Sequence, residues 1–242
     1  MYRRLSSNQA QSPTSVLDES RRRRSRRRLS RQYGIDSIRE TKQGQTQTQE
    51  KNTWGICDVE DCCEGARYLV KQKLVDGKRL TIDGGSAGGF TTLAALAFDN
   101  VFTRAVASTA SPTWLRCNWK HTSSSRAIDL DQLIAPWPGP KGRPVYDERS
   151  PINHVDKLKC SVIFFQGDED KIVPPNQSET MYEALKKKGI TTSYVLFEGE
   201  QHGFRKKENV IACLEGELYF FGKVLGFQPA DDIKEPPKID NL

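Results

Sequence analysis

The hydrophobic pattern over residues 54–242 alternates between short apolar runs and longer stretches with helical spacing. Short runs rich in β-branched and aromatic side chains indicate strands, and apolar residues at intervals of three and four indicate helices. The pattern predicts strands at 79–83, 101–108, 160–167 and 191–197. It predicts helices at 58–73, 90–98, 177–188 and 208–225. Alternating strands and helices are typical of an α/β protein with a parallel sheet.

Three of these elements carry informative apolar faces. Residues 160–167 form a continuous apolar run, as expected of a parallel strand covered on both faces. In the helix at 58–73 we expect Asp58 to be the N-cap and Cys62 and Cys63 to lie on the buried face. The last helix carries one apolar stripe, which predicts a face that packs on the sheet. This stripe consists of Val210, Ile211, Leu214, Leu218, Phe221, Val224 and Leu225.

The junction between the first predicted strand and the next helix carries the first chemical signal. A serine at the apex of a strand–turn–helix, in the pattern Gly-x-Ser-x-Gly, is typical of the nucleophile elbow of α/β-hydrolases. Because the backbone at such an apex is strained, we expect a Cβ atom to collide at Gly84 and at Gly88. The following helix directs its free amides at the serine. The alternative is a Gly-rich turn with an incidental serine. The elbow residues are Gly84, Gly85, Ser86, Gly88 and Gly89.

A serine nucleophile needs a base, and the base needs a carboxylate to orient it. Both should follow strands, at the same edge of the sheet as the elbow. His202 follows the strand at 191–197 and is flanked by Gly203, whereas His121 lies in an irregular insertion and His154 precedes a strand. His202 is therefore the expected base, and the alternative is a surface loop histidine.

The carboxylate is less sharply defined by the residues alone. The loop after the strand at 160–167 contains three acids within reach of the base: Asp168, Glu169 and Asp170. We prefer Asp170 as the partner of His202. The order Ser, Asp, His along the chain is the order that α/β-hydrolases use.

Charge divides the chain into two predicted parts. Residues 1–53 carry 13 Lys and Arg against 5 Asp and Glu, whereas residues 54–242 carry 24 against 26. The first part also has almost no large apolar residues, which predicts a disordered basic tail followed by one folded domain at 54–242. The run Arg21–Arg28 suggests a nuclear-localisation signal, but no aromatic or groove-reading element accompanies it, so we do not expect nucleic-acid binding.

The cysteines and the apolar runs exclude several other classes. The six cysteines show no paired spacing, and no second Cys or His pair follows Cys57, Cys62 and Cys63 at metal-ligand spacing. We therefore expect free thiols, no metal and no cofactor. No apolar run reaches the ~20 residues of a membrane span, and no N-terminal apolar segment marks secretion. We expect a cytoplasmic protein, with nuclear entry through the basic run as the alternative.

Three motifs together resemble the C-terminal catalytic domain of the prolyl oligopeptidase family of serine peptidases, in its acylaminoacyl-peptidase and dipeptidyl-peptidase-like branch. They are Gly84–Phe90, Gly167–Pro174 and Glu200–Phe204, supported by Trp54–Asp61 and Arg149–Asn153. The resemblance implies an α/β-hydrolase fold over about 54–228. It implies that Asp170, which two residues separate from Val173-Pro174 in the family motif, is the acid. It also implies that the backbone N–H of Ala87 is an oxyanion donor.

The chain also departs from the family pattern. It lacks the β-propeller and the first half of the hydrolase domain, together with the loop whose tyrosine is the family's second oxyanion donor. We therefore expect a partial α/β-hydrolase fold, the C-terminal half of the parallel sheet with its flanking helices. The nucleophile strand would then be an edge strand, and an apolar edge strand invites self-association.

The first functional hypothesis is a serine-type peptidase that hydrolyses short peptides through Ser86, Asp170 and His202. The runner-up is a carboxylesterase-type hydrolase. A further alternative is a non-catalytic truncated product that acts by interaction. Three tryptophans of the irregular insertion at 109–150 either line a substrate pocket or pack the insertion onto the domain: Trp114, Trp119 and Trp137.

Overall fold

The computed structural model of the chain describes residues 52–108, 133–135 and 142–242. The predicted tail, with its arginine-rich run, lies almost wholly outside these residues, so its disorder and its boundary with the folded domain stay predictions. The three tryptophans of the insertion also lie outside the described residues.

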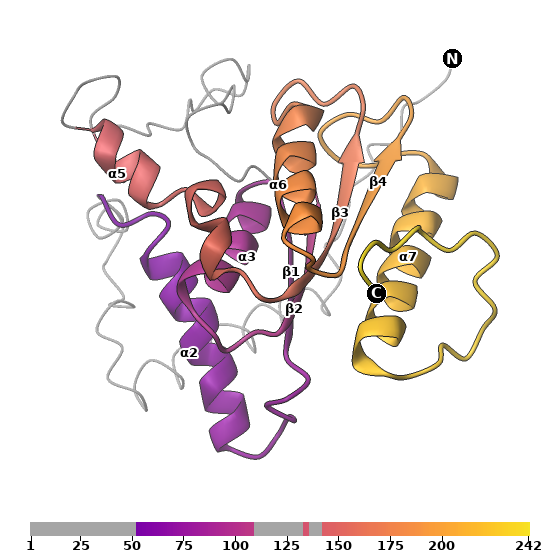
Figure 1. Ribbon diagram of the computed structural model, residues 1–242, viewed down its shortest axis with the longest axis horizontal. Helices are drawn as coiled ribbons and strands as arrows, with labels where there is room; N and C mark the ends of the chain where they lie inside the picture. Colours follow the sequence, from indigo (N-terminus) through magenta and orange to yellow (C-terminus); the bar gives the residue numbers. More distant parts are fainter. Residues whose placement is uncertain (1–51, 109–132, 136–141) are drawn as a thin grey trace, which may run out of the picture. The chain divides into compact units, whose positions relative to one another are not determined.

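The four predicted strands form one parallel sheet (Figure 1). Their order in the sheet is their order in the chain, and every neighbouring pair is parallel. The turns after β1, β3 and β4 therefore meet at one edge of the sheet, where the strands end. The strands are β1 (Thr81–Gly85), β2 (Arg104–Ser108), β3 (Ser161–Gly167) and β4 (Thr192–Phe197).

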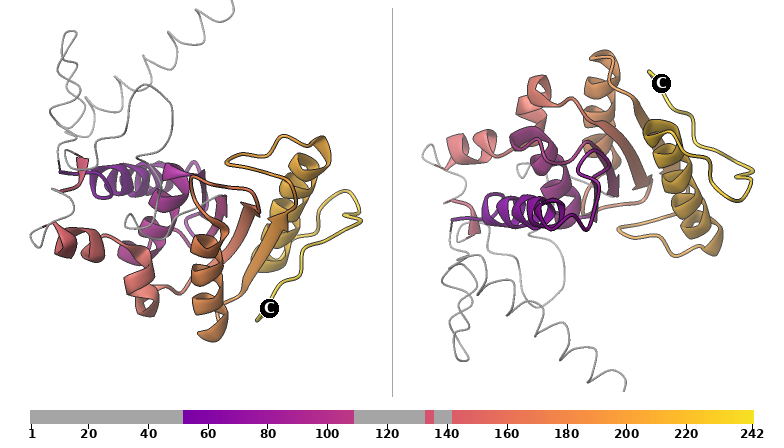
Figure 2. Two further views of the ribbon diagram at one scale, coloured as in Figure 1. Left: turned by 90° about the horizontal axis from the view of Figure 1, so that it is seen from above. Right: turned by 90° about the horizontal axis from the view of Figure 1, so that it is seen from below.

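Helices cover both faces of the sheet. The helical elements are α2 (Cys57–Lys71), α3 (Ala87–Phe98), α5 (Arg143–Glu148), the 3₁₀ segment η3 (Pro151–Lys157), α6 (Pro175–Lys187) and α7 (Lys207–Leu225). Figure 2 shows α2, α3 and α6 on one side of the sheet and α7 on the other. The α3 helix packs on β1 and β2, α6 packs on β3 and β4, and α7 packs on β2 and β3. The predicted layered α/β arrangement is confirmed.

The larger hydrophobic core fills the space between the sheet and the layer of α2, α3 and α6. Successive strand residues point to opposite faces, so alternate positions of β2 and β3 enter this core. The fully buried side chains of this core include Phe90, Leu93, Ala105, Ala107, Val162, Phe164, Met181 and Leu185. The predicted two-sided burial of β3 is confirmed, because Ile163 and Phe165 are fully buried on the other face, in the cluster that contains Phe220 of α7.

The smaller core lies between the sheet and α7, and it uses only part of the predicted stripe. Four stripe residues are between 39% and 63% exposed: Val210, Ile211, Leu214 and Leu218. The helix instead turns Gly216 and Phe220 toward the sheet, and a Cβ atom on Gly216 would lie 3.3 Å from the ring of Phe165. The close approach at Gly216 therefore decides which face of α7 is buried.

One expectation for α2 is wrong, and a second holds only in part. Asp58 does not cap the helix; its carboxylate accepts hydrogen bonds from the Gly55 amide (2.6 Å) and from the Thr91 hydroxyl of α3 (2.6 Å). Of the paired cysteines, only Cys63 is buried, and Cys62 is exposed. The cause is geometric, since adjacent helical residues lie about 100° apart and only one of them can face α3.

The two edges of the described sheet differ. Along the described part of the chain, β1 is an edge strand, with β2 as its neighbour. At the opposite edge, Asp240 forms an antiparallel bridge with Thr192 of β4, and the Ser193 hydroxyl donates to the Lys238 carbonyl (2.7 Å). The predicted self-association through the β1 edge stays a prediction.

Candidate active site

Ser86 lies on the sharp turn between β1 and α3. Its backbone has φ 55° and ψ −119°, a conformation that non-glycine residues rarely adopt and that costs on the order of 1–3 kcal/mol. The α3 helix begins at the next residue, Ala87, and the Phe90 amide donates to the Ser86 carbonyl (3.1 Å). The turn therefore raises the serine side chain at the carboxyl edge of the sheet.

The glycines of the elbow have different reasons to be glycine. A Cβ atom on Gly84 would lie 2.3 Å from the carbonyl oxygen of Gly88, so β1 and α3 approach this closely because Gly84 has no side chain. A Cβ atom on Gly88 would meet nothing within 4 Å, and the expected collision there is wrong. In this contact Gly88 supplies the carbonyl oxygen, and Gly84 is the position at which a side chain would not fit. Gly85 is exposed at the end of β1, and Gly89 is buried in α3.

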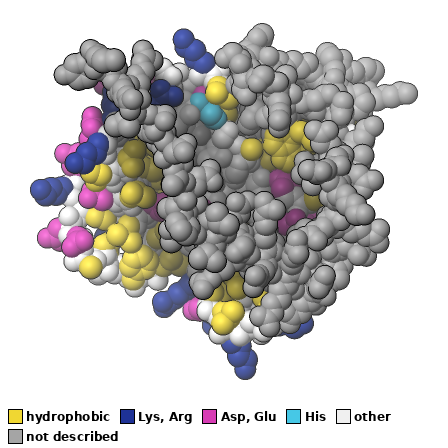
Figure 3. Space-filling view, turned by 180° about the vertical axis from the view of Figure 1, so that it is seen from behind, with side chains coloured by type: hydrophobic (Ala, Val, Ile, Leu, Met, Phe, Trp, Pro, Cys, Tyr) yellow, Lys and Arg dark blue, Asp and Glu magenta, His cyan; other side chains and the backbone are white. Residues whose placement is uncertain are grey.

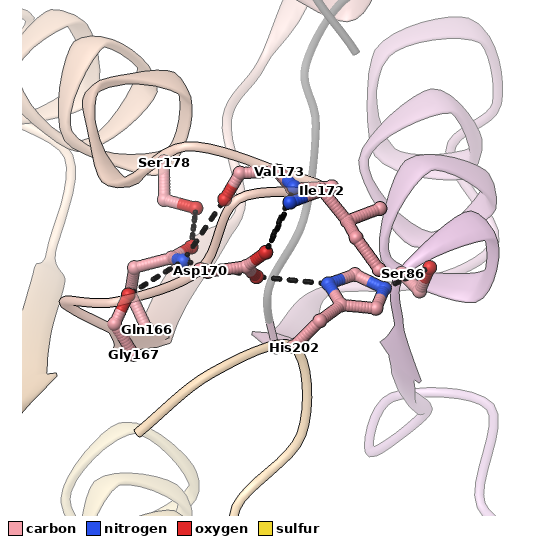
Figure 4. A network of polar contacts seen from close by, with 8 residues as sticks. All are labelled: Ser86, Gln166, Gly167, Asp170, Ile172, Val173, Ser178 and His202. Carbon is pink, nitrogen blue, oxygen red and sulfur yellow. Dashed lines mark hydrogen bonds and ion pairs between the residues drawn. The ribbon is translucent and has the colours of Figure 1, made fainter. Parts of the chain in front are cut away.

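A chain of hydrogen bonds connects three side chains from three separate loops (Figure 4). The Oγ atom of Ser86 lies 2.7 Å from Nε2 of His202, and Nδ1 of His202 lies 2.8 Å from Oδ2 of Asp170. A carboxylate only accepts hydrogen bonds, so Nδ1 carries the proton and Nε2 accepts the serine hydroxyl. The side chain of Asp170 is fully buried and that of His202 is 19% exposed.

The carboxylate of Asp170 is held from several sides. Its Oδ1 atom accepts the amides of Ile172 and Val173, each at 2.9 Å. Its Oδ2 atom, which faces His202, also lies 3.3 Å from Nε2 of Gln166. Gln166 was not expected from the sequence, because a glutamine at the end of an apolar strand carries no recognisable motif.

The other two acids of this loop occupy different positions. Oδ1 of Asp168 accepts the amide of Gly199 (2.7 Å), and the amide of Glu169 donates to the carbonyl of Glu200 (2.9 Å). Both side chains are exposed. The two residues therefore join the loop after β3 to the loop after β4, and Asp170 is the acid that contacts His202.

The loop that carries His202 is closed by Glu200, which sequence reasoning missed. The Glu200 side chain accepts the amides of Arg205 and Lys206, each at 2.8 Å, and the side-chain amide of Asn209 at 3.0 Å. Burial alone would raise the pKa of Glu200, but these hydrogen bonds and the charge of Lys206 outweigh it and hold the pKa below its usual value. An acid two residues before the histidine was the available signal.

The sequence also offered two other histidines, His121 and His154, as candidate bases. His154 lies in the η3 segment, and its Nε2 atom is 2.7 Å from the carbonyl oxygen of Glu148. His121 lies outside the described residues. Within the described ranges, no group of three His, Cys, Asp or Glu residues is arranged to hold a metal ion. None of the described helices combines the length and apolar character that a membrane span requires.

Two further motifs singled out in the sequence meet in space. The guanidinium of Arg149 donates to the carbonyl oxygens of Trp54 and Asn52, each at 2.9 Å. The Trp54 amide donates in turn to the carbonyl of Leu133 (3.1 Å). Arg149 thus fastens the first described residues to the segment that precedes η3.

A parallel sheet with a strained serine turn after one strand, and a carboxylate–imidazole pair after two others, defines an α/β-hydrolase domain. A model of the prolyl oligopeptidase family matches residues 41–228, and the chain belongs to this family. The resemblance that the three motifs predicted is confirmed.

Individual relatives agree with the family. The chain is 29% identical over 153 residues to dipeptidyl aminopeptidase BIII of Pseudoxanthomonas mexicana, covering 62% of this chain and 22% of the relative. It is 28% identical over 168 residues to the acylamino-acid-releasing enzyme of Arabidopsis thaliana, covering 61% and 20%. The structure of a puromycin-hydrolyzing peptidase from Mycobacterium tuberculosis superposes with a TM-score of 0.71 and 39% identity, covering 79% of this chain and 29% of that one.

The chain is thus much shorter than the proteins it resembles. It spans 22% of the length of the Pseudoxanthomonas relative and 20% of the length of the Arabidopsis relative. These relatives are peptidases, which supports a hydrolase domain. Their whole-protein activities and substrates are properties of longer chains.

Proposed function

We propose that the chain is a serine-type hydrolase that cleaves amide bonds in short peptides. The observation that carries this proposal is the continuous hydrogen-bond chain from Ser86 through His202 to Asp170. Its geometry matches the requirement of nucleophilic catalysis, in which the nucleophile lies within hydrogen-bond reach of its base and a third group orients that base.

In the first step, Oγ of Ser86 attacks the substrate carbonyl carbon while Nε2 of His202 takes the hydroxyl proton. Asp170 holds the imidazole with its proton on Nδ1 and stabilises the imidazolium that forms. The tetrahedral intermediate collapses when His202 donates its Nε2 proton to the leaving amine, which leaves an acyl group on Ser86. Water then attacks this ester, with His202 again acting as base and then acid.

The oxyanion of the intermediate would lie against the amide of Ala87. This residue begins α3, and the amides of the first helical turn have no acceptor inside the helix. The positive end of the helix dipole adds to the stabilisation. Among the described residues we assign the oxyanion role to the Ala87 amide alone. Loss of one of two such donors commonly slows turnover by about 10²- to 10³-fold. We therefore expect acylation by reactive probes to be easier to detect than turnover.

A fluorophosphonate probe tests this function directly. It forms a covalent bond only with an activated serine, so the folded chain should be labelled and the Ser86→Ala variant should not. The matched control is Ser178→Ala, which removes another buried hydroxyl, one that donates to Gln166 on the far side of Asp170. A folded chain that takes no label at any pH between 6 and 9 would contradict the proposal and favour a non-catalytic role.

The kind of substrate is decided by a second comparison. An aminoacyl anilide offers an amide bond and a short acyl ester offers an ester bond, so a peptidase should cleave both and a carboxylesterase the ester alone. Puromycin is the third compound, because the M. tuberculosis peptidase of 39% identity is described as puromycin-hydrolyzing. Release of product from the anilide or from puromycin, lost in Ser86→Ala, would support amide hydrolysis.

A further inference from the structure

Gln166 occupies a position that the hydrogen-bond chain alone does not explain. It is the penultimate residue of β3, and its side chain is completely buried. Its Nε2 atom faces three oxygen atoms: the Gly167 carbonyl at 3.1 Å, the Val173 carbonyl at 3.2 Å and Oδ2 of Asp170 at 3.3 Å. Its Oε1 atom accepts the hydroxyl of Ser178 of α6 at 2.8 Å.

The chemistry of these neighbours determines how the amide is oriented. Carbonyl and carboxylate oxygens only accept, so the amide nitrogen must point at them and the amide oxygen at the Ser178 hydroxyl. The reverse orientation would place four acceptors together in a buried space. Figure 4 shows the resulting network, in which the amide of Gln166 lies between Ser178 and Asp170.

We propose that Gln166 is a positioning residue for the hydrolase site, whose amide bridges the two ends of the acid loop and holds Asp170 toward His202. This inference rests on the proposed function. Gly167 begins the loop and Val173 is near its end, so one side chain fastens both. Because Gln166 and His202 share the Oδ2 atom, the amide also withdraws negative charge from the oxygen that His202 uses.

The charged groups around this network are few. From the facing loop, His202 is the titratable side chain that contacts Asp170. From the acid loop itself, the charged side chains of Asp168, Glu169 and Lys171 are exposed. From α6, the contact is the neutral hydroxyl of Ser178. A change at Gln166 should therefore be felt by His202 through Asp170.

Two variants separate positioning from mere structural support. Gln166→Met keeps the side-chain volume and removes the donor to Asp170. Ser178→Ala is the matched control, because it removes a buried hydrogen bond from the same network but leaves the Gln166 amide in place to donate to Asp170.

The first measurement is the titration of the His202 ring by NMR, assigned by its loss in His202→Gln. Without the Gln166 amide, Oδ2 of Asp170 keeps more of its negative charge and stabilises the imidazolium more strongly. The pH midpoint of the His202 titration should therefore be higher in Gln166→Met than in the wild type. It should stay at the wild-type value in Ser178→Ala. This readout needs no catalytic activity, so its result is independent of whether the wild type is labelled by fluorophosphonate.

The second measurement is the rate of fluorophosphonate labelling in the folded variants. Loss of the hold on Asp170 should slow labelling about 10- to 100-fold in Gln166→Met, with little change in Ser178→Ala. Titration of His202 at the wild-type midpoint in Gln166→Met would overturn the inference. An equal shift in Ser178→Ala would also overturn it, because the network would then act only as structural support.

Discussion

A Cβ atom on Gly167 would lie 2.4 Å from the carbonyl oxygen of Glu200. Gly167 ends β3 and begins the loop that carries Asp170, and Glu200 lies in the loop that follows β4 and carries His202. The two loops therefore meet backbone to backbone, at a position where no side chain fits. This contact brings the acid within 2.8 Å of the histidine, although the two residues come from separate strands.

Gly167→Ala should separate these loops. The new methyl group would meet backbone atoms that cannot rotate away, so we expect a loss of about 1–3 kcal/mol of folding free energy, together with a strong loss of fluorophosphonate labelling. Gly65→Ala is the control, because a Cβ atom there meets nothing within 4 Å and α2 gains a better helix former. Thermal unfolding and labelling measured on both variants check the prediction, and a normally labelled Gly167→Ala protein would contradict it.

The elbow offers a matched pair of glycine substitutions. Gly84→Ala places a methyl group 2.3 Å from the Gly88 carbonyl oxygen and should destabilise the domain by about 1–3 kcal/mol. Gly88→Ala places its methyl group in open space inside a helix and should leave stability equal or slightly higher. The melting temperatures of the two variants provide the test. Equal destabilisation would show that both glycines are restricted, as the sequence pattern first suggested.

The three acids of the loop after β3 can be distinguished by amide substitution. Asp170→Asn replaces one acceptor oxygen by a donor, which favours the wrong tautomer of His202, and should slow acylation by about 10⁴-fold. Asp168→Asn is the control, since its side chain is exposed and accepts only the Gly199 amide among the contacts described. Labelling rates of both folded variants decide the assignment. A larger loss in Asp168→Asn would reassign the acid.

Glu200 should contribute stability that depends on pH. Its pKa is lowered in the folded chain, so the stabilisation is fully present above the unfolded value of about 4.3 and is lost as pH falls through the lower folded value. Glu200→Gln turns one acceptor into a donor facing the amides of Arg205 or Lys206, and should lower the melting temperature at pH 7.

The pH dependence of this variant is the sharper test. As the wild-type carboxylate is protonated, the difference in melting temperature between wild type and Glu200→Gln should narrow as the pH falls below the unfolded pKa of about 4.3 and through the lower folded pKa of Glu200. The exposed Glu235→Gln is the matched control and should track the wild type. A difference that stays constant with pH would refute the role assigned to the carboxylate.

The local features of this fold follow from the sequence for clear physical reasons. The continuous apolar run before Gly167 predicts a strand covered on both faces, and β3 is that strand. The Gly-x-Ser-x-Gly pattern predicts a turn around Ser86 because a strained apex needs small neighbours, and the turn has a positive φ. The preference for Asp170 over its two neighbours came from the loop after β3, and the family resemblance agreed with it. Each of these predictions depends on residues that are close together in the chain.

The alternation of strands and helices, the place of the elbow and the order of serine, acid and histidine were determined by the sequence alone, because they depend on local propensity and spacing. Tertiary structure decided the contacts that bridge separate segments. Asp170 and His202, 32 residues apart, meet because the loops after β3 and β4 pack against each other. Leu214 is exposed because α7 packs on the sheet through Gly216 and Phe220. Such contacts depend on the packing of elements far apart in the chain, which no local pattern encodes.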